Sequence, residues 1–88
     1  MKFEFASIFE KDLKKIRENR VLISFQNILT NLKKAESIFE IEGVRKMVGA
    51  KNAYRIRINE YRVGFYLINN IIQFKRFLNR KDIYKYFP

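Results

Sequence analysis

The chain has 88 residues, 48% of them hydrophobic, which is enough for one domain with one modest core. Lys and Arg number 19 against nine Asp and Glu, and this net charge of +10 indicates a polyanionic partner: nucleic acid, an acidic protein or anionic lipid. Because Cys and His are absent, disulfides, thiol catalysis, zinc sites and Ser-His-Asp triads are excluded. No apolar run reaches the length of a signal peptide or membrane span, so we expect a cytoplasmic protein.

The N-terminal half has the pattern of a strand followed by two helices. Residues 2–6 alternate polar and apolar side chains, which predicts a short strand. Ser7 and Glu10 have the spacing of a capping box at the start of a first helix, which would end around residues 18–20. Apolar residues at helical spacing then predict a second helix from residue 21 to about residue 37 or 39. The short connection makes the two helices an antiparallel hairpin.

After Gly43 the apolar period changes from helical to alternating. This pattern predicts strands over residues 44–48, 54–58, 61–68 and 71–78, with tight turns at 59–60 and 69–70, and then a helix over 83–87 capped by Asp82. The order of elements predicts one α+β domain over residues 1–88. In it the N-terminal strand and the α-hairpin pack on a mainly antiparallel sheet of four to five strands, with a short C-terminal helix.

Arginines alternate with apolar residues on the predicted strand 54–58. With the apolar residues against the helices, Arg55 and Arg57 lie on the opposite face about 7 Å apart, a distance that resembles the spacing of successive phosphates. Arg62 begins the next strand and is expected on the same face. Any single arginine there fits an ordinary solvated surface. Three arginines with little acidic compensation favour a phosphate-binding surface, because the guanidinium fork suits phosphate oxygens.

The C-terminal tail combines basic and aromatic residues. Arg80 leaves the last strand, and Tyr84 should lie one helical turn after it. The Tyr84 ring can stack on an extruded base, or its hydroxyl can exchange a proton. Alternatively it packs the final helix against the sheet, as we expect for Phe87, and the residues alone leave this choice open. Lys46 and Lys51, just before the arginine strand, would extend the basic surface.

Five stretches follow one another in an order and at spacings that are more specific together than any one of them alone. They are FEKDLKKI at 9–16, GVRKM at 43–47, AYRIRI at 53–58, EYRVGF at 60–65 and NRKDIY at 79–84. In this succession the chain resembles the RelE/ParE superfamily of bacterial toxins over essentially its whole length. The resemblance implies a RelE-like, microbial RNase-like fold and the toxin of a type II toxin–antitoxin system, with a cognate antitoxin as partner.

The resemblance to the RelE branch also implies a reaction and its residues. The toxin would enter the ribosomal A site and cut mRNA by transferring the scissile phosphate to the neighbouring 2′-hydroxyl, with no cofactor and no metal. The implied catalytic residues are Arg55, Arg57, Arg62, Arg80 and Tyr84, with Arg62 on the scissile phosphate. Arginine is a poor proton acceptor at neutral pH, so its work is electrostatic, whereas tyrosine suits stacking or general acid catalysis. We expect Lys46, Lys51, Asn79 and Lys81 to bind RNA, and the resemblance implies mRNA on the ribosome, with 16S rRNA contacts, as the partner.

One position departs from the family pattern. Many relatives have a histidine immediately before the tail arginine, where this chain has Asn79, and an asparagine cannot trade a proton near neutral pH. Two alternatives therefore stay open beside the endoribonuclease. One is a ParE-like toxin that inhibits DNA gyrase without cutting nucleic acid, and the other is a catalytically weak nucleic-acid-binding relative. The full set of four arginines and a tyrosine favours the nuclease, because ParE-like members usually lack it.

Overall fold

A computed structural model describes residues 1–88 as an α+β fold around one mixed sheet. The five strands lie in the order β1-β5-β4-β3-β2. Strands β2 to β5 pair antiparallel, while β1 pairs parallel with β5. This arrangement confirms the predicted fold class. The strand bounds are β1 (Lys2–Phe5), β2 (Val44–Lys46), β3 (Ala53–Ile58), β4 (Tyr61–Ile68) and β5 (Ile71–Asn79).

Tight turns join the three long strands. Asn59 has φ 52°, and Asn69 and Asn70 have φ 52° and 63°, a left-handed conformation that asparagine adopts more readily than most residues. Both turns therefore fall where the sequence predicts them. They also fix the register, which pairs Arg57 with Arg62 directly across β3 and β4.

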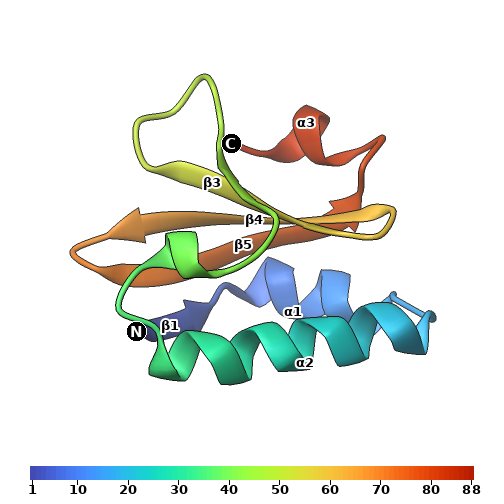
Figure 1. Ribbon diagram of the computed structural model, residues 1–88. Helices are drawn as coiled ribbons and strands as arrows, with labels where there is room; N and C mark the ends of the chain where they lie inside the picture. The colour runs from blue at the N-terminus through green and yellow to red at the C-terminus, as the bar shows by residue number, and fades with distance from the viewer.

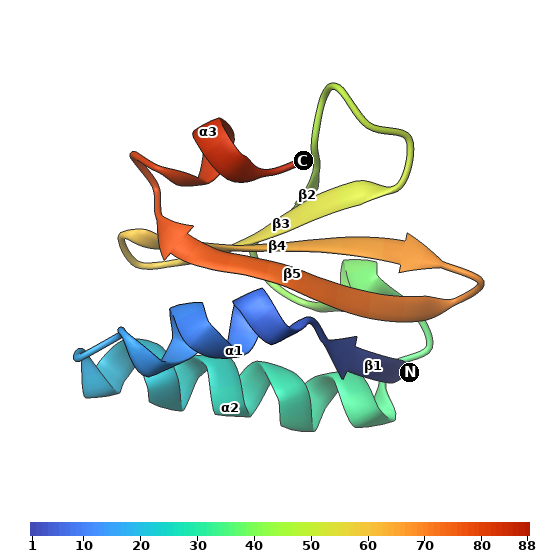
Figure 2. The ribbon, with the colours of Figure 1, turned by 180° about the vertical axis from the view of Figure 1, so that it is seen from behind.

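The helices divide unequally between the two faces of the sheet (Figures 1 and 2). The antiparallel pair α1 (Ser7–Lys14) and α2 (Asn19–Lys34) covers one face, and the short α3 (Ile83–Tyr86) lies on the other face beside the loop between β2 and β3. A 3-10 turn, η1 (Ile38–Glu40), connects α2 to β2. None of the helices combines the length and apolar character that crossing a membrane requires.

The main core lies between the helical hairpin and the sheet. Its centre is aromatic: Phe9 and Phe25 from the helices contact Phe74 and Phe77 from β5, with ring centroids 5.2–5.7 Å apart. All four rings are at most 3% exposed, so they supply much of the apolar burial that stabilises the fold. A second, smaller cluster on the opposite face consists of Met47, Ala53, Ile83 and Phe87.

Several element bounds are shorter than the sequence predicts. The first helix ends at Lys14 and the second at Lys34, because the chain turns to an extended conformation at Ala35 (ψ 147°) and forms η1 as a separate turn. The strand predicted to reach residue 48 ends at Lys46, and Val48 is 97% exposed in the following loop. Hydrophobicity alone made these elements too long, since the buried residues beyond them lie in irregular segments.

The capping hydrogen bonds predicted for the first and last helices do not form. Ser7 is already inside α1, whose cap residue is Ala6 and has no side-chain hydrogen bond. The capping box instead belongs to η1, where the Ser37 hydroxyl accepts from the Phe39 amide and the Glu40 carboxylate accepts from the Ser37 amide. Asp82 is the cap residue of α3, as predicted, but its side chain makes no capping hydrogen bond. The capping-box spacing occurs twice in this chain, and the turn geometry decides which copy forms.

Candidate nucleic-acid interface

The arginines of β3 face away from the helical hairpin. Ile56 and Ile58 are at most 4% exposed on the core side, so the alternating side chains Arg55 and Arg57 point to the opposite side. Arg62 stands directly opposite Arg57 on β4, and residues directly opposite in antiparallel strands share a face. The structure therefore brings Arg55, Arg57 and Arg62 onto one surface, as the alternation predicts.

Arg45 extends this surface to the edge strand. It pairs with Arg55 in the register of β2 and β3, and its side chain is exposed. The sequence did not single out Arg45 for a role, because its face depends on how β2 aligns with β3. The available signal was its place in the middle of a three-residue strand, between Val44 and Lys46. We call Arg45, Arg55, Arg57 and Arg62 the arginine face.

The arginine face has no acidic partner. The ion pairs of the protein join Arg76 to Asp12, Arg80 to Glu60 and Lys85 to Asp82. Two like-charged cross-strand pairs thus lie side by side, and like charges placed directly opposite destabilise a sheet. A feature that opposes stability and is not compensated locally is expected where a function requires it.

Backbone carbonyls hold two of these guanidinium groups in place. Arg55 Nη1 donates to the Gly43 carbonyl at 2.6 Å. Arg62 Nη1 donates to the carbonyls of Asn59 and Tyr61, both at 2.9 Å. A guanidinium has five N–H donors, so most of them stay available for a ligand. The charged groups are therefore oriented without being neutralised.

The electrostatic environment of Arg62 connects the sheet with the tail. Partial burial lowers the pKa of the Arg62 guanidinium below its ordinary value, and the charges of Arg55 and Arg57 lower it further. Among the smaller influences on this pKa, Tyr84 raises it and Arg80 lowers it. Since such influences weaken with distance, these four residues lie around Arg62. The pKa of Arg62 is thus influenced by each of the other four side chains predicted to be catalytic.

The tail is fixed to this region through Phe87. The Phe87 ring is 3% exposed and lies on Gly64 of β4, where an added Cβ would stand 2.5 Å from Phe87 Cδ2. Ile83 is fully buried in the same cluster. Phe87 therefore packs α3 against the sheet, as predicted. Tyr84 does not share that role, because it is 64% exposed.

The remaining tail residues have local partners. Arg80 Nε lies 2.7 Å from the Glu60 carboxylate, in a pair whose two side chains are more than half exposed. The Asn79 side-chain oxygen accepts a hydrogen bond from the Lys81 amide at 3.0 Å. Asn79 thus shapes the turn that leads from β5 to Arg80 and α3.

The predicted lysines do not join the arginine face as a group. Lys46 pairs with Tyr54 in the sheet and so lies on the other face from Arg45; its Nζ donates to the Ala50 carbonyl at 2.9 Å and stands 5.4 Å from the centre of the Tyr54 ring. Lys51 is exposed in the loop between β2 and β3, and Lys81 is exposed after β5. No three His, Cys, Asp or Glu side chains gather into a group able to hold a metal ion.

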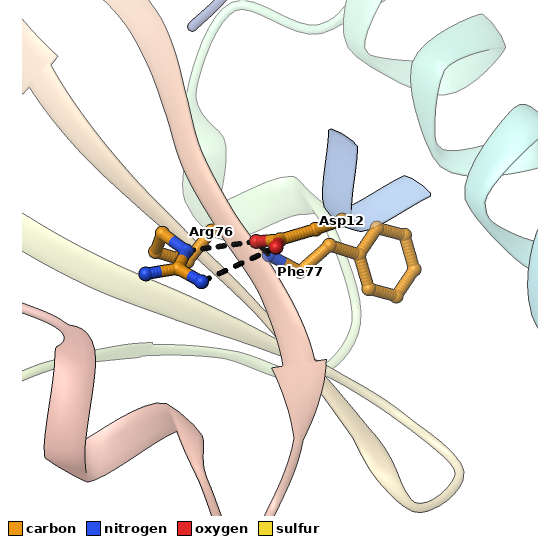
Figure 3. A network of polar contacts seen from close by, with 3 residues as sticks. All are labelled: Asp12, Arg76 and Phe77. Atoms are coloured by element: carbon orange, nitrogen blue, oxygen red, sulfur yellow. Dashed lines mark hydrogen bonds and ion pairs between the residues drawn. The ribbon is translucent and has the colours of Figure 1, made fainter. Parts of the chain in front are cut away.

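A different arginine, Arg76 of β5, is fully paired (Figure 3). Its Nε and Nη2 donate to the Asp12 carboxylate of α1 at 2.8 and 3.2 Å, and the Phe77 amide donates to the same carboxylate at 3.0 Å. Asp12 is 4% exposed and is the buried charged residue of the chain. The hydrogen bond to Asp12 raises the pKa of Arg76. This site ties the first helix to the edge of β5.

Comparison with known proteins places this architecture among toxins solved with their antitoxins. The structure matches the RelB–RelE antitoxin–toxin complex from Methanococcus jannaschii with a TM-score of 0.82 and 34% identity, covering 96% of this chain and 98% of that one. It shares its fold with the Escherichia coli RelBE complex (TM-score 0.69, 16% identity, 89% and 94% covered) and the E. coli DinJ–YafQ complex (0.65, 14%, 93% and 96%). No protein-family model matches the chain.

The sequence itself identifies the family. The chain is 36% identical to Toxin RelE3 of Methanocaldococcus jannaschii over 89 aligned residues, which cover all of both proteins. The fold and the full-length identity together define a toxin of the type II toxin–antitoxin class. The chain belongs to the RelE family.

Proposed function

We propose that the protein acts on the ribosome as an mRNA endonuclease and that its reaction needs no metal or cofactor. The observation that carries this proposal is the unpaired arginine face, with Arg80 and the exposed Tyr84 beside Arg62. Four guanidinium groups without acidic partners favour an RNA-binding surface over an ordinary solvated one. Their like-charged pairs oppose folding, and a bound polyanion would relieve this repulsion. The proposed place of action is the cytoplasm, with 16S rRNA contacts beside the mRNA.

The proposed chemistry is an intramolecular phosphoryl transfer. The 2′-hydroxyl gives its proton to solvent water as its oxygen bonds to the scissile phosphorus, and the bond from phosphorus to the 5′-oxygen breaks. The 5′-oxygen takes up a proton, so the products are a 2′,3′-cyclic phosphate and a 5′-hydroxyl. Arg62 holds the scissile phosphate, and Arg55, Arg57 and Arg80 stabilise the charge that grows on the pentacovalent transition state. Tyr84 stacks on a base next to the cleavage point or gives the leaving 5′-oxygen its proton.

Asn79 fits this scheme as a residue that positions the tail. Its side-chain oxygen is engaged with the Lys81 amide, in the turn from which Arg80 and α3 depart. We therefore assign it no proton transfer. In this proposal the absence of a histidine leaves Tyr84 as the proton donor and predicts slower cleavage than in relatives that have both groups.

The test is to map mRNA 5′ ends on translating ribosomes after induction of the toxin. Because the proposed product carries a 5′-hydroxyl, new ends should be captured only after enzymatic phosphorylation, and they should lie in A-site codons. We expect Arg62→Ala to reduce cleavage about 10²–10³-fold, the usual effect of removing one group that stabilises transition-state charge. Arg20→Ala, which removes an exposed arginine at the start of α2, is the matched control and should cleave normally. Intact mRNA together with DNA breaks would replace this function with gyrase inhibition.

Two substitutions separate the roles open to Tyr84. Tyr84→Phe keeps the ring for stacking and removes the hydroxyl, whereas Tyr84→Ala removes both. If the hydroxyl is the general acid, Tyr84→Phe should lower the single-turnover rate about 10²–10⁴-fold, nearly as much as Tyr84→Ala. If only stacking matters, Tyr84→Phe should cleave normally.

We also propose that a cognate antitoxin neutralises the toxin. The matched M. jannaschii and E. coli proteins were solved in RelB–RelE and RelBE complexes. A net charge of +10 favours a partner whose contact segment is acidic. Such a segment, laid over the arginine face, would mask the groups that bind RNA. Full binding by a variant antitoxin whose contact segment has lost its acidic residues would refute this mode of neutralisation.

A further inference from the structure

A polar groove opens beside the arginine face, between α2 and the end of β3. Its volume is about 1010 Å³, and only three of its 13 lining residues are hydrophobic. Strand β2 begins opposite Ile56, so Ile58 and Asn59 lie beyond the part of β3 that pairs with β2, and they border the groove. Sites for small ligands commonly measure about 300–1,000 Å³, so the groove has room for at least one nucleotide.

The groove is continuous with the arginine face. Arg45, Arg55 and Arg57 line it, and Arg57 pairs across the strands with Arg62, the proposed ligand of the scissile phosphate. Neighbouring strands lie about 4.8 Å apart. A strand of RNA whose phosphate sits on Arg62 therefore meets Arg57 and the groove within the length of one or two nucleotides.

The wall formed by α2 presents neutral hydrogen-bonding groups. Ser24, Asn27 and Asn31 line the groove, and their spacing of three and four residues puts them on one stripe of the helix. None of these side chains makes a hydrogen bond within the protein, so their donors and acceptors are free. Side-chain amides offer a paired donor and acceptor, the arrangement that reads base edges.

Acidic residues on the opposite wall limit where phosphates can lie. The Glu40 carboxylate is already used by the amides of Glu36 and Ser37, at 2.8 and 3.0 Å. Glu42 has no partner and faces the same groove. Phosphates are therefore directed to the arginines, and bases to the amides of α2 and to the free Glu42 carboxylate, which can accept from a base amino group.

We propose that this groove is a second RNA subsite, which binds the nucleotide next to the scissile phosphate and reads its base. Arg45 contacts the backbone phosphate, and Asn27 and Asn31 hydrogen-bond the base edge. This inference rests on the proposed function and adds to it a place where sequence preference arises. It also gives a role to Arg45, which stands outside the predicted catalytic set.

The experiment measures binding of short single-stranded RNAs to the full chain by fluorescence anisotropy. The probes differ in a single base and are titrated at several salt concentrations. Arg45→Gln should weaken all probes alike and reduce the slope of log K against log salt by about 0.7, the value for one lost phosphate contact on single-stranded nucleic acid. The Asn27→Ala, Asn31→Ala double variant should keep the slope and lose about fivefold or more of the discrimination between bases.

Matched controls lie on exposed parts of α2 outside the groove. Gln26→Ala removes an amide and Arg20→Gln removes a charge, and both should leave base discrimination unchanged. Thermal melting of each variant checks that it is folded.

The possible results distinguish failure of the subsite from failure of the proposed function. Weaker binding by Arg62→Ala, with groove variants that match their controls, overturns the subsite and leaves the proposed function standing. Wild-type protein that binds none of the probes also overturns the subsite, and cleavage mapping on ribosomes then judges the proposed function separately. Groove variants that bind RNA normally but no longer bind the antitoxin reassign the groove to a protein partner.

Discussion

Arg55 and Arg76 lie in one row across the sheet, on either side of Gly64, in opposite electrostatic settings. Arg76 donates two hydrogen bonds to the buried Asp12 carboxylate, and this hydrogen bonding raises the pKa of Arg76. Arg55 stands opposite Arg45 and close to Arg62, whose own pKa is lowered by burial and by neighbouring arginines. An arginine thus stabilises the fold through an ion pair at one end of the row and destabilises it through like-charge repulsion at the other.

The boundary between these regions is the Phe87 ring on Gly64. Arg76 faces the tail side of this boundary and lies 5.3 Å from the centre of the Tyr86 ring, so it has partners on both sides. The arginines of the arginine face form no ion pair, and their hydrogen bonds go to backbone carbonyls. The difference teaches that local pairing, and not the number of arginines, separates a structural charge from one available to a ligand.

The largest expected effect comes from breaking the paired end. Asp12→Ala leaves the Arg76 guanidinium and the Phe77 amide without their acceptor, and removing one partner of a buried ion pair destabilises by about 3–5 kcal/mol. Urea unfolding should show this loss of stability as a lower midpoint. Asp82→Ala is the control, since its pair with Lys85 is 3.9 Å long and exposed, and should change stability by less than about 1 kcal/mol. Equal losses of stability in the two variants would mean that the buried Asp12–Arg76 pair contributes no more than an exposed ion pair.

The boundary itself can be disturbed by one methyl group. Gly64→Ala places Cβ against the Phe87 ring, and overpacking of this kind costs about 1–3 kcal/mol. We expect faster tryptic cleavage in α3 as the tail detaches. In a Phe87→Ala background the same change should be nearly neutral, and a double-mutant cycle measures the coupling. Additive effects would show that Phe87 and Gly64 do not meet in solution.

The unpaired end should respond in the opposite direction. Arg57→Gln removes one of two facing like charges and should raise the free energy of unfolding by about 0.2–1 kcal/mol, while it weakens RNA binding. The gain should shrink in 1 M salt, where the Debye length is about 3 Å. Arg20→Gln, in the same titration, should show no gain. A loss of stability in Arg57→Gln at low salt would contradict the strain assigned to the arginine face.

The smallest effect is expected at the exposed pair of the tail. Glu60→Gln breaks an ion pair of 2.7 Å whose side chains are 65% and 56% exposed, and such pairs contribute about 0–1 kcal/mol. Thermal melting should therefore barely change. Because Arg80 loses its acidic partner, RNA binding should become tighter and more sensitive to salt. Weaker binding would indicate that Glu60 is needed to position Arg80.

The sequence predicts well those features of the fold and the site that depend on neighbouring residues. Period-two alternation places Arg55, Arg57 and Arg62 on one face, and the asparagines mark both hairpin turns, because strand geometry and left-handed turns are set by neighbouring residues. The tail also follows the prediction, with Phe87 buried and Tyr84 exposed. These features need no knowledge of distant contacts.

Long-range pairing was beyond the same reasoning. Placing Arg45 on the arginine face requires the register of β2 against β3. Predicting the ion pair of Arg76 requires knowing that its partner lies 64 residues away in the sequence. A bulge between Phe74 and Arg76 also breaks the alternation of β5. One signal was present: Asp12 follows Phe9 by three residues and precedes Ile16 by four, so an acidic residue stood on an apolar stripe.

The like-charged pairs of the arginine face also bear on how such a protein changes over generations. Since like charges face each other there, substitutions that remove one of these arginines are expected to raise stability and to weaken the proposed RNA binding, the usual trade between stability and activity. A lineage released from selection for toxicity would shed these arginines early, while Asp12 and Arg76 would persist because losing either destabilises the fold. In a degenerate gene copy that still encodes Asp12 and Arg76, the number of arginines left on the arginine face would therefore indicate how long ago selection for activity ended.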